Sequence, residues 1–224
     1  MKRQQFAVIG LGRFGSAMAT TLAHLGQDVI GVDGEPERVR ALADAVTQTI
    51  ELDATDERAL KAAGIQNVDV AVVSIGENIE SSLLVVMLLK ELGIKTIVAK
   101  AVTALHGRIL QKLGVSRVVF PEREMATRMA HSLVIPNTID YIELSRDYSI
   151  VDLPAPDAFV GKNLKQLELR PRFGLTLIAI KRRDAETEVT NIAPGAEEVI
   201  KAGDVLALLG TTTDLKRLDD MLKR

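Results

Sequence analysis

A glycine-rich turn near the beginning of the chain has the composition of a phosphate-binding loop. Gly10, Gly12 and Gly15 form G-x-G-x-x-G within "FAVIGLGRFGSAMATTLAHLGQDVIGVD" (6–33), and Asp33 lies 18 residues beyond Gly15. Gly10 permits the tight turn, Gly12 lets the backbone approach a phosphate, and Gly15 allows close packing of helix on strand. The helix N-terminus binds the anion, and the acid accepts the ribose hydroxyls. The pattern therefore predicts a bound nucleotide without a 2′-phosphate, which the acid would repel; the alternative is a fold that has lost its ligand.

Arg13 lies in the same turn, together with Phe14. A cation at a helix N-terminus costs about 0.3–1 kcal/mol unless an anion compensates for it. Arg13 is therefore either an exposed side chain or a clamp on a phosphate. Because backbone groups serve the diphosphate of NAD, an additional cation favours a ligand with more negative charge, such as ADP or ATP.

Three further groups of residues are placed near the nucleotide by the expected topology. In a doubly wound sheet, ligands bind at the carboxyl ends of the strands, where the strand order reverses. The loops after the third and fourth strands and the end of the fifth strand lie at this edge. The candidates there are Asp53, Ala54, Thr55, Ser74, Ile75, Gly76 and Lys100. For each of them, ordinary turn chemistry is the alternative.

Two acids begin a later expected helix. In "FPEREMATR" (120–128), Pro121 stands at the helix start, and Glu122 and Glu124 lie in the first turn. Acids at this position complement the helix dipole, which is the simpler explanation. A carboxylate at the carboxyl edge of the sheet also suits a divalent cation beside phosphates.

Residues 1–134 alternate short apolar runs with helical patterns. The runs are continuous and rich in Val, Ile and Ala, as in strands that are covered on both faces. We expect strands at 6–10, 28–32, 47–51, 69–74, 96–100 and 117–120. We expect helices near 14–25, 36–45, 56–63, 78–92 and 103–112. Six strands joined by five crossovers predict an α/β fold, a doubly wound parallel (Rossmann) sheet of order 3-2-1-4-5-6.

The remainder of the chain has a different pattern. "VIPNTIDYIELS" (134–145) interrupts the alternation, and we expect a crossover helix–turn–helix linker over 135–147. Residues 148–224 show a strand, a turn, a short helix, further strands at "LTLIAIKRR" and "GDVLALLG", and an amphipathic terminal helix. The prediction is a nucleotide-binding N-lobe over 1–134, the linker, and a smaller α+β C-lobe over 148–224. So small a domain is marginal alone, which favours pairing with a second copy.

The composition excludes several classes of function. The chain has 28 basic and 30 acidic residues among 224, five Phe, two Tyr and no Trp. It therefore lacks the basic surface and stacking aromatics of proteins that bind nucleic acid. The absence of Cys excludes disulfides and thiol catalysis and fits a reducing cytosol. The longest apolar run, "LLVVMLL" (83–89), is shorter than the roughly 20 residues that span a bilayer, so we expect a membrane link only through a partner.

An enzyme is the weaker interpretation of the nucleotide site. A dehydrogenase needs an acid or base near the nicotinamide and a substrate pocket. His24 and His131 fall within helical patterns, and His106, at a helix start, is the remaining candidate. We therefore expect a nucleotide-sensing protein that is not an enzyme. A small NAD-dependent oxidoreductase and a nucleotide-dependent interaction module with a non-transport partner are the alternatives.

Several motifs, taken in order, resemble the RCK family (regulators of potassium conductance). They are "FAVIGLGRFG", "VD", "DATD", "PERE", "IAIKR" and "GDVLALLG". One glycine fingerprint and one C-lobe pattern resemble the cytosolic gating subunits of bacterial Ktr potassium uptake systems rather than the tandem Trk type. The resemblance implies homodimers that assemble into an octameric ring, bound to a KtrB-like membrane potassium-transporting subunit at the inner face of the cell membrane. It also implies activation by ATP and inactivation by ADP.

The resemblance assigns roles to individual residues. Arg13 corresponds to an arginine that reaches phosphates across a dimer interface, and Asp33 to the ribose acid. Glu122 corresponds to an acid near the γ-phosphates that binds a divalent cation (Mg²⁺ or Ca²⁺). In some relatives the C-lobe binds cyclic di-AMP at a dimer interface. The loosely matching positions here are Leu164, Leu169, Arg170, Thr176 and Pro194, and Pro171 departs from the family pattern.

Overall fold

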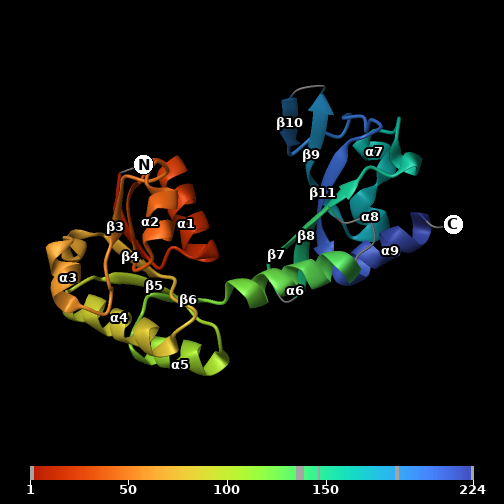
Figure 1. Cartoon of the computed structure of the whole chain (residues 1–224). Helices are drawn as coiled ribbons and strands as arrows, with labels where there is room; N and C mark the ends of the chain where they lie inside the picture. Colours follow the sequence, from red (N-terminus) through yellow and green to blue (C-terminus); the bar gives the residue numbers. More distant parts are fainter. Residues whose placement is uncertain (1–2, 135–138, 146, 185–186, 223–224) are drawn as a thin grey trace. The chain divides into compact units, whose positions relative to one another are not determined.

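The computed structural model describes residues 3–134, 139–145, 147–184 and 187–222, which are coloured in Figure 1. The chain divides into two compact units, Met1–Pro121 and Glu122–Arg224. Each unit has its own sheet and its own apolar core. Among the described helices, none combines the length and the apolar character needed to span a bilayer.

A six-stranded parallel sheet forms the first unit. Its strands are β1 (Gln5–Ile9), β2 (Asp28–Asp33), β3 (Gln48–Glu51), β4 (Val70–Val73), β5 (Thr96–Lys100) and β6 (Arg117–Val119). The spatial order is β3-β2-β1-β4-β5-β6, which confirms the predicted order. Since the order reverses between β1 and β4, the carboxyl ends of these two strands flank the position at which such sheets bind ligands.

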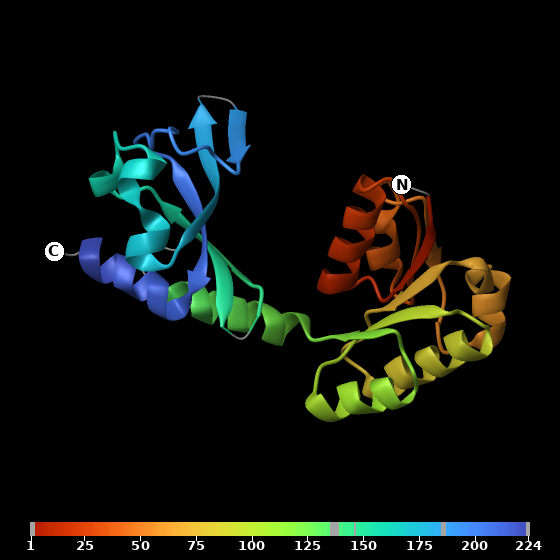
Figure 2. The same ribbon diagram turned by 180° about the vertical axis from the view of Figure 1, so that it is seen from behind.

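Helices cover both faces of this sheet (Figures 1 and 2). They are α1 (Arg13–His24), α2 (Pro36–Leu42), α3 (Glu57–Ala62), α4 (Ile79–Glu91) and α5 (Ala104–Lys112). Successive residues of β1 point to opposite faces, as the pleat requires. Val8 joins the apolar cluster of α1 and α2, whereas Ala7 and Ile9 join the cluster of α3, α4 and α5. Burial on both faces explains why the strands are continuous apolar runs.

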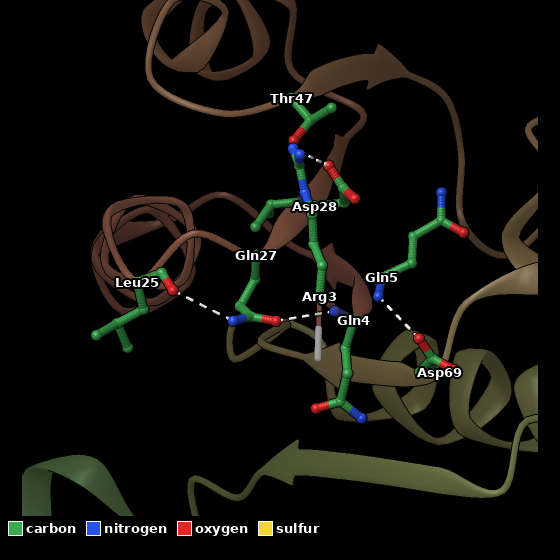
Figure 3. A network of polar contacts seen from close by, with 9 residues as sticks. Arg3, Gln4, Gln5, Leu25, Gln27, Asp28, Thr47 and Asp69 are labelled. Carbon is green, nitrogen blue, oxygen red and sulfur yellow. Dashed lines mark hydrogen bonds and ion pairs between the residues drawn. The ribbon is translucent and has the colours of Figure 1, made fainter. Parts of the chain in front are cut away.

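Polar contacts join neighbouring strands at the amino edge of the sheet (Figure 3). Arg3 Nη2 donates to Asp28 Oδ1 at 2.5 Å, and Gln5 N donates to Asp69 Oδ2 at 2.9 Å. These bonds join the start of β1 to the residues that begin β2 and precede β4. The opposite, carboxyl edge carries the glycine turn and is the edge at which a ligand would bind.

A five-stranded antiparallel sheet forms the second unit. Its strands are β7 (Asp140–Glu143), β8 (Tyr148–Pro154), β9 (Thr176–Asp184), β10 (Thr187–Ile192) and β11 (Val205–Thr211). Their order is β10-β9-β11-β8-β7. The helices are α6 (Pro121–Val134), α7 (Leu164–Leu167), α8 (Leu169–Phe173) and α9 (Thr212–Leu222). Leu215 and Leu218 of α9 are buried in the core of this sheet, as expected for an amphipathic terminal helix.

A buried ion pair fixes the loop before β11. Arg182 Nε and Nη2 donate to the two carboxylate oxygens of Asp204, both at 2.8 Å. Burial alone would raise the pKa of Asp204, but the bonds from Arg182 and from Lys201 N hold it below its usual range. The pair therefore joins β9 to the loop before β11 through two parallel hydrogen bonds.

The helix–turn–helix predicted over 135–147 is wrong, because Asp140–Glu143 is the edge strand β7, paired with β8. Tyr141 is the only buried residue of this four-residue strand, so the segment lacks an apolar alternation long enough to identify a strand from sequence. Positions 135–138 and 146 of the predicted linker lie outside the described residues.

Helix α6 belongs to the second unit, whereas the predicted boundary at residue 134 placed it in the first. Arg128 Nη2 donates to Asp140 Oδ1 at 2.6 Å, and the ring of His131 stacks on Tyr141 with 4.8 Å between centroids. The hydrogen bond from Arg128 lowers the pKa of Asp140. These contacts between α6 and β7 explain the position of the division.

A buried histidine makes the stability of the first unit depend on pH. His106 of α5 is 1% exposed, its Nδ1 accepts from Val102 N at 3.5 Å, and Nε2 has no partner among the described residues. Burial lowers the pKa of His106 because the imidazolium loses hydration. The unfolded chain therefore binds this proton more readily. The free energy of unfolding is therefore undiminished above the unfolded pKa of about 6.5, and it decreases as the pH falls below that value.

We expect the free energy of unfolding to fall between roughly pH 7 and pH 5, and to fall less in His106→Asn, whose amide does not titrate. Each unit of difference between the folded and unfolded pKa contributes about 1.4 kcal/mol. Urea unfolding at a series of pH values measures this, with the exposed His24→Asn as the control. Parallel pH profiles for wild type and His106→Asn would contradict the expectation.

Candidate functional site

The glycine turn after β1 has no room for side chains at two of its three glycines. Gly10 has a φ of +93°, and a Cβ built on it would lie 3.1 Å from the backbone nitrogen of Ile75. A Cβ on Gly15 would clash with the carbonyl oxygen of Gly10 and lie 2.9 Å from Ser74 Oγ. A Cβ on Gly12 meets nothing within 4 Å. The glycines thus provide a tight turn, close packing and an open surface, which are the roles that the fingerprint predicts.

The N-terminus of α1 is suited to an anion. Gly12 caps the helix without a side-chain hydrogen bond, and the first turn contains no acidic residue. The N–H groups of this turn therefore keep their capacity to bind a phosphate. Arg13 is exposed and begins the helix, where its charge is unfavourable without an anion.

Asp33, at the end of β2, is a buried carboxylate that the surrounding backbone holds in place. Oδ2 accepts from Leu11 N at 2.6 Å, Oδ1 accepts from Glu35 N at 2.9 Å, and the residue is 8% exposed. Each carboxylate oxygen has a further lone pair that can accept a ribose hydroxyl. Because Leu11 belongs to the glycine turn, the acid and the phosphate loop are joined by a direct bond.

Two charged residues beside Asp33 were not predicted from the sequence. Arg38 Nη1, on α2, lies 3.6 Å from Asp33 Oδ2, and Arg38 Nη2 lies 3.6 Å from Glu77 Oε1 in the loop after β4. Arg38 could have been identified from the sequence, because it lies in the first turn of a helix that starts at Pro36. The proximity of Glu77 follows only from the strand order.

The loop after β4 brings Ser74 and Ile75 against the glycine turn, as predicted. Ser74 N donates to Ile9 O at 2.7 Å, and the backbone of Ile75 packs on Gly10. Ser74 is buried, and its Oγ has no hydrogen-bond partner among the described residues. An unpaired buried hydroxyl is costly, and this one lies against Gly15, where α1 packs on the loop after β4.

Phe14, Gly76 and Lys100 lie close to one another beside the turn. Lys100 Nζ lies 5.9 Å from the centroid of the Phe14 ring and 3.6 Å from the position of a Cβ on Gly76. The Lys100 side chain thus extends from the end of β5 to the loop after β4. Direct contact of these three residues with a nucleotide stays a prediction.

The predicted loop after β3 bonds mainly within itself. Asp53 Oδ1 accepts from Thr55 Oγ1 at 2.7 Å and from Thr55 N at 2.9 Å, and these bonds lower the pKa of Asp53. Ala54 is buried in the apolar core. Leu52 N donates to Asp33 O at 3.1 Å, which joins the loop to the end of β2. The bonds are those of an ordinary turn, and contact with adenine stays a prediction.

Glu122 lies in the first turn of α6, is exposed, and belongs to the second unit. Within the described parts of the chain, no three His, Asp or Glu side chains are grouped as a metal site. A divalent cation on Glu122 would therefore need oxygen ligands from nucleotide phosphates as well. The role of Glu122 stays a prediction.

The residues predicted to bind a C-lobe ligand differ in their surroundings. They are Leu164 on α7, Leu169 and Arg170 on α8, Thr176 at the start of β9, and Pro194 after β10. Leu164 N donates to Glu198 O at 3.1 Å, which joins α7 to the loop that contains Pro194. Leu169 is buried in the core, whereas Arg170 and Thr176 are exposed. The structure thus joins two of the four segments that contain these five residues, and the ligand stays a prediction.

A cavity of about 300 Å³ that was not predicted lies between α6 and β7. Its lining consists of Arg123, Glu124, Thr127, Arg128, Tyr141, Ile142 and Glu143. The cavity depends on the position of β7, so the incorrect helical prediction for this segment also concealed the cavity.

The family of the chain follows from its relatives. Residues 6–121 match the TrkA-N domain, and residues 148–223 match the TrkA-C domain. The chain is 40% identical over 217 residues to the Ktr system potassium uptake protein C of Bacillus subtilis (strain 168), covering 97% of this chain and 96% of that protein. The chain belongs to the KtrA-type branch of the RCK family. It is also 38% identical over 220 residues to the Ktr system potassium uptake protein A of the same strain, with coverages of 98% and 97%.

The fold of this RCK chain is also similar to that of the GsuK channel bound to NAD, with a TM-score of 0.61 and 18% identity. That match covers 99% of this chain and 40% of the channel chain, so the chain spans well under half of its length. At this identity the likeness shows the fold alone. Membership of the KtrA-type branch confirms the expectation of a regulatory protein that is not an enzyme.

Proposed function

We propose that the chain is the cytosolic regulatory subunit of a potassium uptake system. It binds adenine nucleotides in the N-lobe and gates a KtrB-like membrane potassium-transporting subunit. The observation that carries the nucleotide site is Asp33, buried and bonded to the glycine turn through Leu11 N at 2.6 Å. The similarity to Ktr proteins A and C supports potassium transport as the process. In this proposal the protein is cytoplasmic and is held at the inner face of the cell membrane by its partner.

ATP activates and ADP inactivates in this proposal. A ligand shifts a conformational equilibrium only by its differential affinity for the two states. The terminal phosphate of ATP supplies that difference, because it adds negative charge beside Arg13 and, with Mg²⁺ or Ca²⁺, an oxygen ligand set that includes Glu122. NAD and NADH are weaker ligands of the same site, and cyclic di-AMP is a second ligand in the C-lobe.

Homodimers that assemble into an octameric ring complete the proposal. Met125, Met129 and Leu133 recur every four residues on α6, and they are 53%, 55% and 81% exposed. Such a row of large apolar side chains supports an interface with a second copy. In the first unit, Leu84 and Met87 of α4 are also substantially exposed.

We expect Arg13→Ala to weaken ATP binding about tenfold more than NADH binding. One hydrogen bond to a charged group is worth about 1.5–3 kcal/mol, and backbone N–H groups serve the diphosphate of NADH in either protein. Calorimetric titration of both ligands measures the difference, and Arg58→Ala, an exposed arginine in the first turn of α3, is the matched control. Equal losses for ATP and NADH, together with turnover of NADH, would favour the oxidoreductase and contradict the sensor.

The same titrations test the divalent cation. We expect Mg²⁺ to strengthen ATP binding in the wild type and Glu122→Gln to reduce that gain. Glu124→Gln removes the same charge from the same helical turn and is the control. An equal effect of the two substitutions would show that the cation responds to the total charge of the acidic turn and is not bound by Glu122 itself.

A further inference from the structure

A single guanidinium lies between two carboxylates from different loops at the ribose end of the proposed nucleotide site. Arg38 Nη1 is 3.6 Å from Asp33 Oδ2, and Arg38 Nη2 is 3.6 Å from Glu77 Oε1. Asp33 is the last residue of β2 and Glu77 follows β4, and these two strands flank β1 in the sheet. Arg38 thus links the loops on the two sides of the glycine turn.

The three side chains differ in exposure, which determines which of them can rearrange when a ligand binds. The Asp33 side chain is 7% exposed, that of Arg38 is 42% exposed and that of Glu77 is 91% exposed. Asp33 is fixed by backbone bonds and cannot turn away from a ligand. Arg38 and Glu77 are accessible and can rearrange, so they are the groups that can respond to what the ribose carries.

Arg38 lies beside the acid that would bind the ribose in the proposed site. In this class of site the acid at the end of the second strand binds the 2′-hydroxyl, and a nearby arginine is the group that accepts a 2′-phosphate. Here the arginine is present, but its second nitrogen, Nη2, forms an ion pair with Glu77. Two carboxylates against one guanidinium leave the ribose end with a net charge of −1, which disfavours a 2′-phosphate.

We propose that Arg38 and Glu77 together determine selection at the ribose 2′ position, with Glu77 holding Arg38 away from a 2′-phosphate. The inference rests on the proposed nucleotide-binding function. It makes selection against 2′-phosphorylated nucleotides a property of three side chains rather than of Asp33 alone. Removing Glu77 releases the guanidinium for the phosphate, whereas removing Arg38 leaves only carboxylates at this end.

The test compares two ligands that differ only in the 2′-phosphate, namely AMP and adenosine 2′,5′-bisphosphate. Each is used to displace ADP from the full-length protein, and the ratio of their dissociation constants (bisphosphate over AMP) measures selection. We expect the ratio to exceed one in the wild type, to rise about tenfold in Arg38→Ala and to fall about threefold in Glu77→Gln, the smaller effect being that of an exposed charge. In Arg38→Ala/Glu77→Gln, the effect of the second substitution should be clearly smaller than in the wild-type background, because only the charge of an exposed carboxylate is then removed.

Matched variants control for charge alone. Arg40→Ala removes an exposed arginine from the same helix, and Glu80→Gln removes an acid from the first turn of α4. A ratio that stays within twofold of wild type in both Arg38→Ala and Glu77→Gln overturns the inference. So does an undiminished effect of Glu77→Gln without Arg38, because Glu77 would then act through its field and not by holding the guanidinium. Failure of ADP to bind the wild-type protein would instead refute the proposed function.

Discussion

Gly15→Ala is expected to destabilise the first unit by about 2–4 kcal/mol, the range of a severe steric substitution in a packed interior. The added Cβ would clash with the carbonyl oxygen of Gly10 and approach Ser74 Oγ to 2.9 Å. Neither neighbour can yield easily, because one is backbone in a tight turn and the other is buried. Urea unfolding measures the loss, and calorimetry should show that ADP binding is lost with it.

Two other glycines separate folding from binding in this experiment. Gly12→Ala places a Cβ where nothing lies within 4 Å, so stability should change little. The methyl group would nevertheless occupy the surface that a phosphate approaches, and ADP affinity should fall. Gly195→Ala, equally unobstructed but in the second unit, should alter neither property. Wild-type stability of Gly15→Ala would show that the helix and strand do not need this close approach.

Asp33→Ala is expected to weaken ADP and ATP binding by at least about tenfold and more if both ribose hydroxyls bond to it, since each charge-assisted bond is worth about 1.5–3 kcal/mol. The substitution also leaves Leu11 N and Glu35 N without their acceptors, so a loss of stability should accompany it. Calorimetric titration at a temperature well below the unfolding transition separates the two effects.

A carboxylate at the other end of the same strand serves as the control. Asp28→Asn removes the ion pair with Arg3 at the amino edge of the sheet and should leave nucleotide affinity unchanged. Unchanged affinity in Asp33→Ala would show that the nucleotide binds elsewhere. Equal losses in both variants would indicate a general weakening of the sheet instead of a lost ribose contact.

The parts of the fold that follow local rules could be predicted from the sequence. Continuous apolar runs such as "FAVIG" and "VDVAVVS" identify strands buried on both faces, and the crossover rule then fixes their order. The spacing of Gly10, Gly12 and Gly15 from Asp33 likewise placed the turn and the ribose acid on adjacent strands. These features depend on short segments whose residue types have one dominant physical explanation.

Features that depend on tertiary contacts were not predicted. Strand β7 has too few apolar residues to be recognised alone, and it is defined by pairing with β8 and by the contacts of Asp140 and Tyr141 with α6. Strand β10 and helix α8 were missed as well, the latter because Pro171 lies inside it. The Arg38–Glu77 contact joins positions 39 residues apart, which no local pattern reveals.

The first turn of α1 has N–H groups that no side chain caps, so the glycine turn can gain hydrogen bonds from a ligand. A ligand that satisfies these groups in the folded chain and not in the unfolded chain stabilises the protein by mass action, by about 2.7 kcal/mol at a hundred times its dissociation constant. A difference of this size changes how long a marginally stable protein survives proteolysis in the cell. With nucleotide as the ligand, ATP and ADP would both extend the lifetime of the protein while their ratio sets its conformation, so a loss of total adenine nucleotide would reduce the number of copies and not merely their activity.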